Sequence, residues 1–326
     1  MKFSERIKRY TSSDNASSMI TVLGALILLL VFFSVSSPHF LSARNLLNIG
    51  LYAAIMGTVA CSMTFINVSG CIDLSVGSQI AVIGMIAGKM MVDYHLPIVA
   101  VIPIALFSGL IFGAFNGFFI TVFKLNPFIT TLGSMQIMRG ICYLINDGSS
   151  YVLADPLFQF IGRHRLFGSI PVSLLIMLGC YLIFSIIGRF TVFGRTIYMV
   201  GGNPQASFLA GIKVNRVKAV LYMVHGLMAG IAALLLSAQT GAALPQAAGE
   251  INMQALSAVI LGGAGLAGGR GTIVGTLFGV LVLCTLNNGM VMLNIPSFWQ
   301  QVVIGSVLII SVSIDAIKGG SLRKKI

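Results

Sequence analysis

The sequence predicts an all-α polytopic membrane protein with about ten transmembrane helices. Hydrophobic residues make up 57% of the 326 residues and charged residues only 9%, which leaves too little polar surface to cover a soluble globule. Apolar runs of about 20 residues recur from one end of the chain to the other, and each is long enough to cross the hydrocarbon layer. No polar stretch is long enough to build a core of its own, so we expect a single transmembrane domain over residues 1–326.

Ten apolar runs follow one another along the chain. A basic segment, MKFSERIKRY, precedes the first run, which is long for a signal peptide and is followed by no A-x-A cleavage site, so we expect it to be retained. The pairs Gly109/Gly113 and Gly275/Gly279 place small residues four apart, a spacing that lets helices approach closely in lipid. The predicted spans are residues 19–36, 46–68, 76–91, 98–122, 127–144, 170–187, 214–237, 253–266, 272–293 and 298–314.

Lysine and arginine are distributed unevenly between the two sides of these spans. With ten spans both termini lie on one side, and fifteen basic residues fall on that side against four on the other, with Arg139 inside a span. Because basic residues collect in cytoplasmic loops, we predict that the tails 1–18 and 315–326 and the polar segment 188–213 are cytoplasmic. The net charge of +12 thus belongs to span ends and indicates no nucleic-acid partner.

The polar segment contains a predicted short helix outside the bilayer. Asn203 suits the N-cap, Pro204 the first helical position and Gly211 the position after the last turn, so PQASFLA forms about two turns. A short capped helix between two spans suits a membrane subunit that receives force from a soluble partner. The residues assigned to this coupling role are Gly202, Asn203, Pro204, Gln205, Ala206, Ala210, Gly211 and Ile212.

Polar residues in or beside the spans are candidates for lining a solute pathway, because such groups are costly in a membrane. Amides and hydroxyls suit a neutral, hydroxyl-rich solute. Asp73 has the alternative role of capping the next helix, and Arg139 that of reaching outward or pairing with Asp147. No span carries a central Asp or Glu, which disfavours an ion-coupled carrier. The pathway candidates are Asp73, Asn116, Gln136, Arg139 and Asn288.

Two stretches are predicted to lie on the side of the membrane opposite the cytoplasmic segments. Residues 145–168 mix apolar and polar residues and could dock a partner or cover a pathway. Residues 239–252 are rich in Gly and Ala, and we expect them to be partly re-entrant, which requires protein or a water-filled cavity around their backbone.

Neither an enzyme nor a metal site is predicted. The five cysteines are scattered and form no metal-ligand spacing. Residues 263–268 fit GxGxxG but lack a βαβ context, and no GxxxxGK[ST] phosphate loop occurs, so the chain does not hydrolyse nucleotide by itself.

Several motifs, in order, carry a family likeness. They are residues 70–78 (GCIDLSVGS), 126–133 (NPFITTLG), 139–140 (RG), 194–203 (GRTIYMVGGN), 210–212 (AGI), 261–271 (LGGAGLAGGRG) and 299–305 (WQQVVIG). With them the chain resembles the membrane permease subunits of bacterial ATP-binding-cassette importers for monosaccharides, the ribose-type permeases, over essentially its whole length. Cys71 stands where the family pattern usually has a second glycine, which implies slightly more crowding before Asp73.

The resemblance implies a homodimer in the bacterial inner membrane, with cytoplasmic ATPase subunits and a periplasmic sugar-binding protein as partners. ATP and Mg would be used by the ATPase, and no cofactor would be bound by this chain. The helix at 203–211 would be the coupling helix that sits in a cleft of the ATPase, and the solute would pass between the two copies. Ribose or a relative such as allose is the first expectation, with xylose, arabinose, galactose and a signalling furanose open. The alternatives are branched-chain amino acids or nucleosides on the same machinery, an ion-coupled carrier, and a membrane enzyme.

Overall fold

The chain forms a bundle of helices. The computed structural model describes residues 3–166 and 170–318, with side chains over 19–166 and 170–313; of the predicted tails, residues 1–2 and 319–326 lie outside this part. About three quarters of the chain is helical (76%). The helices are α1 (Phe3–Ser36), α2 (Ala43–Val68), α3 (Val76–Val92), α4 (Ile98–Thr121), α5 (Pro127–Ile145), α6 (Pro156–Arg163), α7 (Val172–Phe190), α8 (Val192–Gly202), α9 (Pro204–Leu209), α10 (Val214–Thr240), α11 (Ile251–Leu261), α12 (Ile273–Met292) and α13 (Ser297–Lys318).

Every predicted apolar run is helical, but not every run is a full-length span. In the described residues, seven helices are long and apolar enough to cross a membrane: α1, α2, α4, α5, α7, α10 and α12. Three shorter apolar helices lie at Val76–Val92, Ile251–Leu261 and Ser297–Ser313. The predicted run 253–266 ends early, at Leu261, because the glycine-rich loop after it turns the chain; Gly263 there has φ +94°. In the first run the helix starts well before the apolar part, so residues 3–18 of the predicted tail are helical.

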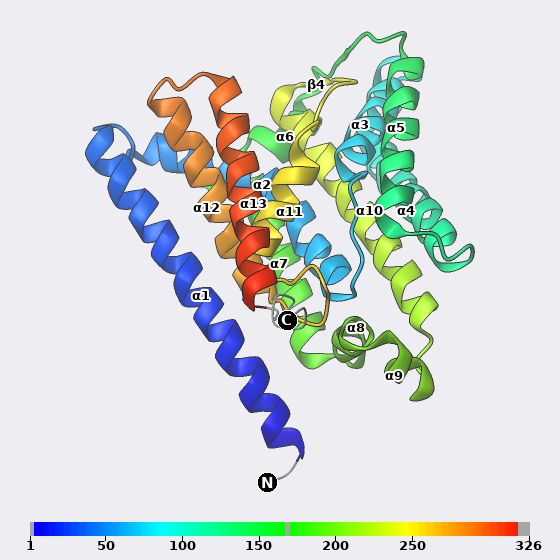
Figure 1. The fold of residues 1–326 in the computed structure, drawn as a ribbon. Helices are drawn as coiled ribbons and strands as arrows, with labels where there is room; N and C mark the ends of the chain where they lie inside the picture. The colour runs from blue at the N-terminus through cyan, green and yellow to red at the C-terminus, as the bar shows by residue number, and fades with distance from the viewer. Residues whose placement is uncertain (1–2, 167–169, 319–326) are drawn as a thin grey trace.

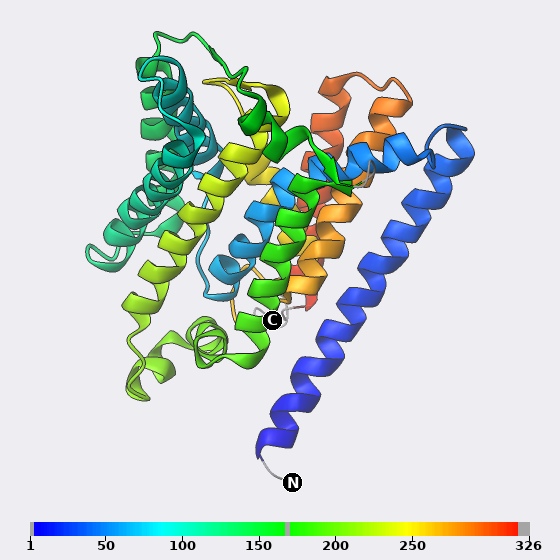
Figure 2. The same ribbon diagram turned by 180° about the vertical axis from the view of Figure 1, so that it is seen from behind.

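Different elements lie at the two ends of the bundle. The start of α1, together with α8 and α9, lies at one end, while α6 and β4 lie at the other (Figures 1 and 2). At the second end β1 (Tyr151–Val152) pairs antiparallel with β4 (Ala242–Ala243). A second small pair joins β2 (Arg165–Leu166) to β3 (Ile170–Pro171). Segments 188–213 and 145–166 thus lie at opposite ends of the bundle, while residues 167 and 168 lie outside the described part. Which end faces the cytoplasm stays a prediction.

Side-chain contacts hold the second end together. Arg163 on α6 donates hydrogen bonds to the carbonyl oxygens of Gln239 and Thr240 at the end of α10, each 2.8 Å long. The Tyr151 hydroxyl donates to Asp93 Oδ2 at 2.7 Å. Burial, with the neighbouring carboxylate, raises the pKa of Tyr151 to about 12. The described part of this stretch, residues 145–166, is thus tied to the end of α10 and to Asp93, which follows α3.

Glycine pairs set the closest helix contacts, as the GxxxG spacing predicts. A Cβ atom on Gly109 of α4 would lie 2.2 Å from the carbonyl oxygen of Gly226 on α10. A Cβ on Gly279 of α12 would lie 2.0 Å from the carbonyl oxygen of Ala258 on α11. Backbones that touch in this way gain dispersion contacts that lipid cannot supply.

Two helices start inside the bundle after non-helical segments. Residues 69–75 run back into the bundle from the end of α2 to the start of α3, and residues 241–250 lead irregularly into α11 (Figure 1). The two segments meet: Asn252 Nδ2 donates to the carbonyl oxygen of Leu74 at 3.0 Å, and a Cβ on Gly77 would lie 2.3 Å from the carbonyl oxygen of Ala248. Both α3 and α11 are therefore short helices that begin inside the bundle, next to each other's preceding segments.

Candidate coupling helix and buried polar site

The predicted short helix forms as α9. Asn203 Oδ1 accepts a hydrogen bond from the amide of Ala206 at 2.9 Å, Pro204 occupies the first turn, and Gly211 has φ +84° beyond the last turn. The coupling residues Gly202–Ala206, Ala210 and Gly211 are exposed, and Ile212 is half-buried. The local geometry of the prediction is confirmed, and its functional role stays a prediction.

Sequence reasoning missed two features of this region. The stretch before Asn203 is itself a helix, α8, and α9 carries two large apolar side chains facing outward, Phe208 at 69% exposure and Leu209 at 82%. Adjacent exposed hydrophobics on a short helix outside the apolar bundle form a surface that suits a protein partner. In the sequence, the feature that could have indicated this surface is that Phe208 and Leu209 follow the capping pair Asn203–Pro204 within one short helix.

Helix α8 is locked to the end of α2. A Cβ on Gly201 would lie 1.6 Å from the carbonyl oxygen of Val68, and the same oxygen accepts a hydrogen bond from the amide of Gly269 at 2.8 Å. Tyr198 of α8 donates to the carbonyl oxygen of Gly271 at 2.9 Å, and burial raises the pKa of this phenol. Helix α8 therefore contacts the point where the 69–75 segment leaves α2.

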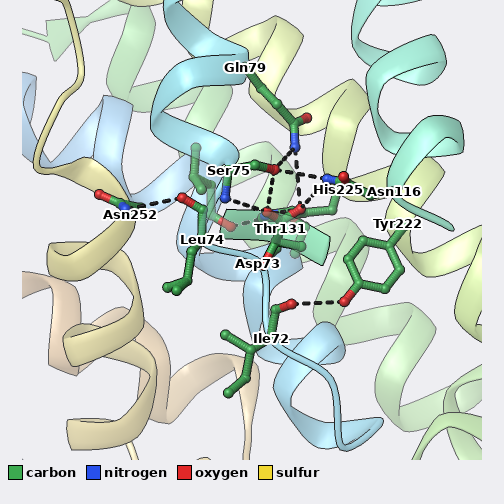
Figure 3. A network of polar contacts seen from close by, with 12 residues as sticks. Ile72, Asp73, Leu74, Ser75, Gln79, Asn116, Thr131, Tyr222, His225 and Asn252 are labelled. Carbon is green, nitrogen blue, oxygen red and sulfur yellow. Dashed lines mark hydrogen bonds and ion pairs between the residues drawn. The ribbon is translucent and has the colours of Figure 1, made fainter. Parts of the chain in front are cut away.

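Asp73 lies wholly buried at the centre of a polar network (Figure 3). Its Oδ1 accepts hydrogen bonds from the Ser75 amide at 2.7 Å and the Ser75 hydroxyl at 2.6 Å. Its Oδ2 accepts from Gln79 Nε2 at 3.2 Å and Asn116 Nδ2 at 3.4 Å, and both amides also donate to Ser75 Oγ at 2.8 Å. Hydrogen bonds to a charged group are stronger than those between neutral groups, and they offset part of the cost of burying the carboxylate. Asp73 thus accepts hydrogen bonds at the start of α3, which resembles the alternative role of capping that helix.

His225 completes the network from α10. Its Nε2 lies 3.9 Å from Asp73 Oδ2, and its Nδ1 shares a 2.7 Å hydrogen bond with the Ser62 hydroxyl of α2. A further bond runs from the Tyr222 hydroxyl to the carbonyl oxygen of Ile72 at 2.8 Å. The network therefore joins α2, α3, α4 and α10 around the 69–75 segment, which places side chains from four helices at one site.

The burial of Asp73 corrects one sequence argument. The long apolar helices carry no central Asp or Glu in the described residues, but Asp73 enters the bundle on the non-helical segment between α2 and α3. Sequence distance from an apolar run does not give depth when the chain folds back. The missing-carboxylate argument against an ion-coupled carrier is therefore wrong for this site.

The other pathway candidates have different surroundings. Arg139 donates from one guanidinium nitrogen to the carbonyl oxygens of Pro245 and Ala247, at 2.6 and 3.0 Å, so it holds the 241–250 segment. Among the described residues it forms no ion pair with Asp147, which is one of the alternatives expected for this residue. Asn288 on α12 forms a reciprocal amide pair with Asn45 on α2, at 2.8 and 2.9 Å. Gln136 is exposed on α5. The structure thus brings Asp73 and Asn116 together and leaves the other three apart.

A second polar cluster lies beside α11. Tyr52 donates to Gln254 Oε1 at 2.7 Å, and Asn287 Nδ2 donates to the Tyr52 hydroxyl at 3.3 Å. Gln301 of α13 donates to Glu250 Oε1 at 2.5 Å. Among the described residues, no group of three or more His, Cys, Asp or Glu side chains could hold a metal ion. The polar chemistry inside the bundle is therefore mostly uncharged amide and hydroxyl.

Helices that begin inside the bundle after non-helical segments, around a buried polar centre, are typical of the membrane subunit of a solute transporter. The exposed capped helix at one end agrees with this class. The model of the family "Branched-chain amino acid transport system / permease component" matches residues 45–312, and the chain belongs to this family of membrane permease components.

Individual relatives match over nearly the whole chain. The ribose import permease of Bacillus subtilis (strain 168) is 39% identical, covering 89% of this chain and 90% of the relative. The xylose transport system permease of Escherichia coli (strain K12) is 32% identical, covering 91% of each. The L-arabinose ABC transporter permease of Azospirillum brasilense is 31% identical, covering 94% of this chain and 90% of the relative.

Proposed function

We propose that this chain is the permease subunit of an ATP-driven importer that moves a monosaccharide across the bacterial inner membrane. The observation that carries the proposal is the likeness, over about nine tenths of each chain, to permeases named for ribose, xylose and arabinose. Ribose or a close relative is the first substrate to test, because the ribose permease of Haemophilus influenzae is also 37% identical. The chain itself hydrolyses no ATP in this proposal; a separate cytoplasmic ATPase subunit does, using Mg.

The α9 helix is the proposed contact with that ATPase. Phe208 and Leu209 would insert into an apolar cleft, while the exposed cations Arg195, Lys213 and Arg216 around them would face acidic residues of the partner. Movement of α9 would pass through α8 to the Gly201–Val68 contact and from there to the segment that carries Asp73. The termini and α9 would be cytoplasmic, in keeping with the distribution of basic residues.

The solute would pass between two copies of the chain. Seven long helices and three short apolar ones would give ten crossings, with the short ones completed by their extended segments. The exposed face of α5 suits the pathway, because Gln136 lies there between Gly133 and Gly140, and a Cβ on either glycine would meet no atom within 4 Å. An open face of this kind leaves room for a partner copy or a hydrated sugar. A periplasmic sugar-binding protein would deliver the solute at the opposite end, near α6.

The alternative cargo is a branched-chain amino acid or a nucleoside on the same machinery. The family description favours testing amino acids, but the centre of the bundle supplies amides and hydroxyls rather than a free charge for a zwitterion. Arg139, which lies about three turns into its predicted span, has its guanidinium on backbone carbonyl oxygens.

Uptake in cells that lack this chain, with and without its restoration, tests the proposal. Labelled pentoses, hexoses, leucine and a nucleoside are compared, and an inactivated partner ATPase serves as the control. Restored uptake of one sugar that disappears with the inactive ATPase is the expected result. Restored uptake of leucine or the nucleoside alone would discard the monosaccharide, and uptake that survives loss of the ATPase would discard the class.

A further inference from the structure

A cavity of about 750 Å³ opens where three helices reach the same level of the bundle. Its lining includes Met19, where the apolar part of α1 begins, Phe190, where α7 ends, and Ile273, where α12 begins. Since the apolar part of a span ends at the hydrocarbon boundary, this cavity lies at the boundary, on the side that carries α8 and α9. Helix α1 packs chiefly on α12 and leaves its α7 side open.

The lining changes from apolar to cationic along the helices. Leu182 and Ile186 of α7 and Val274 of α12 are exposed hydrocarbon side chains that face this space. Arg189 and Arg270 stand at its outer rim, both exposed, and none of the described residues that line the cavity is acidic. Arg189 Cζ lies 5.4 Å from the centre of the Phe190 ring, and this guanidinium has no ion pair within the described part of the chain.

A helix N-terminus adds to the positive potential at the same place. Helix α12 begins in the lining, and its first amides, on Ile273 and Val274, precede the hydrogen bonds of the helix. Free amides at a helix start and the helix dipole both favour an anion. Two guanidinium groups, a helix start and an apolar trough together match a phosphate joined to acyl chains, which neither a free phosphate nor a neutral lipid matches.

We propose that this cavity binds one anionic phospholipid of the leaflet on the α8–α9 side. The phosphate would lie between Arg189 and Arg270, and an acyl chain would follow Leu182 and Ile186 into the space between α1 and α7. Basic pockets between membrane helices recognise anionic headgroups in this way. The inference uses only the membrane location of the chain, so it stands or falls separately from the identity of the transported sugar.

Native mass spectrometry of the purified full-length permease tests the site. The protein is exchanged into phosphatidylglycerol or phosphatidylcholine, and retained lipid is counted for the unaltered chain, for Arg189→Gln with Arg270→Gln, and for Arg195→Gln. Arg195 is a matched control, because it is an exposed arginine of α8 that does not line the cavity. A fourth variant, Ile186→Trp, fills the apolar part without changing charge.

One phosphatidylglycerol per chain should be retained and phosphatidylcholine lost. Each cation contributes about fivefold to the affinity for the lipid, so the double variant should weaken retention about 30-fold. Arg195→Gln should leave retention unchanged. Ile186→Trp should weaken it as well. Equal weakening by Arg195→Gln would mean a diffuse electrostatic attraction, equal retention of phosphatidylcholine would remove the charge recognition, and displacement by millimolar inorganic phosphate would identify a free-anion site; each of these results overturns the proposal.

Discussion

Replacing Gly201 with alanine tests the contact that joins α8 to α2. Gly201 is buried at the last turn of α8, whereas its neighbour Gly202 is exposed, and a Cβ on Gly202 would meet no heavy atom within 4 Å. The added methyl of Gly201→Ala would lie 1.6 Å from the carbonyl oxygen of Val68 and 2.7 Å from the amide of Gly269. Gly202→Ala adds the same methyl, one residue along the same helix, into open space.

The size of the effect follows from these distances. A carbon and a carbonyl oxygen come no closer than about 3.3 Å, so α8 and α2 must separate by about 1.7 Å. Overpacking of this kind costs about 1–3 kcal/mol, and the Gly269–Val68 hydrogen bond, 2.8 Å long, would be stretched at a cost of about 1 kcal/mol. We expect the free energy of unfolding to fall by about 2–4 kcal/mol for Gly201→Ala and to stay almost unchanged for Gly202→Ala.

Two assays separate stability from coupling. Thermal denaturation followed by size-exclusion chromatography should show Gly201→Ala melting below both the unaltered chain and Gly202→Ala. At temperatures where the variant remains folded, substrate uptake should fall while the ATPase partner still hydrolyses ATP, because the moved α8 no longer acts on the end of α2. If Gly201→Ala melts and transports like the unaltered chain, the contact does not hold α8 and the proposed route through it is wrong.

Three further outcomes are expected. Asp73→Asn should lower the free energy of unfolding by about 1 kcal/mol, because the new amide oxygen can still accept both hydrogen bonds from Ser75. Asp73→Ala should lower it by about 3 kcal/mol and reduce the melting temperature clearly, because all four donors lose their partner; equal effects would contradict the network. Cysteines at Val152 and Leu209, both strongly exposed, should react with an impermeant thiol reagent from opposite membrane faces, over a low background because all five native cysteines are buried; labelling from one face would contradict the topology. Arg139→Ala should make residues 241–250 more accessible to protease than Arg139→Lys does, since lysine can still donate to one carbonyl oxygen; equal protection would argue against the anchor.

The sequence was sufficient for features that depend on neighbouring residues. Asn203, Pro204 and Gly211 predict the start and end of α9 because capping and positive φ are local, and each predicted span corresponds to a helix because apolar length is local. The GxxxG spacing of α4 likewise predicts close contact, although it does not name α10 as the partner.

Features that depend on the folded-back chain could not be predicted. The depth of Asp73 arises because residues 69–75 re-enter the bundle, and the partners of Arg139 come from a segment more than a hundred residues away. Gln79 and His225 belong to the site only because α3 and α10 pack beside each other around that segment. Residue type marked several of these positions as polar, but only the arrangement of the helices shows which of them meet.

Reconstitution tests the central claim most directly. The purified chain is placed in lipid vesicles with its ATPase partner and sugar-binding protein, and labelled ribose inside the vesicles is measured with ATP, with a non-hydrolysable analogue, and with a proton or sodium gradient alone. The account predicts accumulation with ATP only, and its loss when Phe208 and Leu209 are both replaced by serine. Accumulation driven by an ion gradient without ATP would contradict it, and would give the buried Asp73–His225 network a role in ion coupling instead.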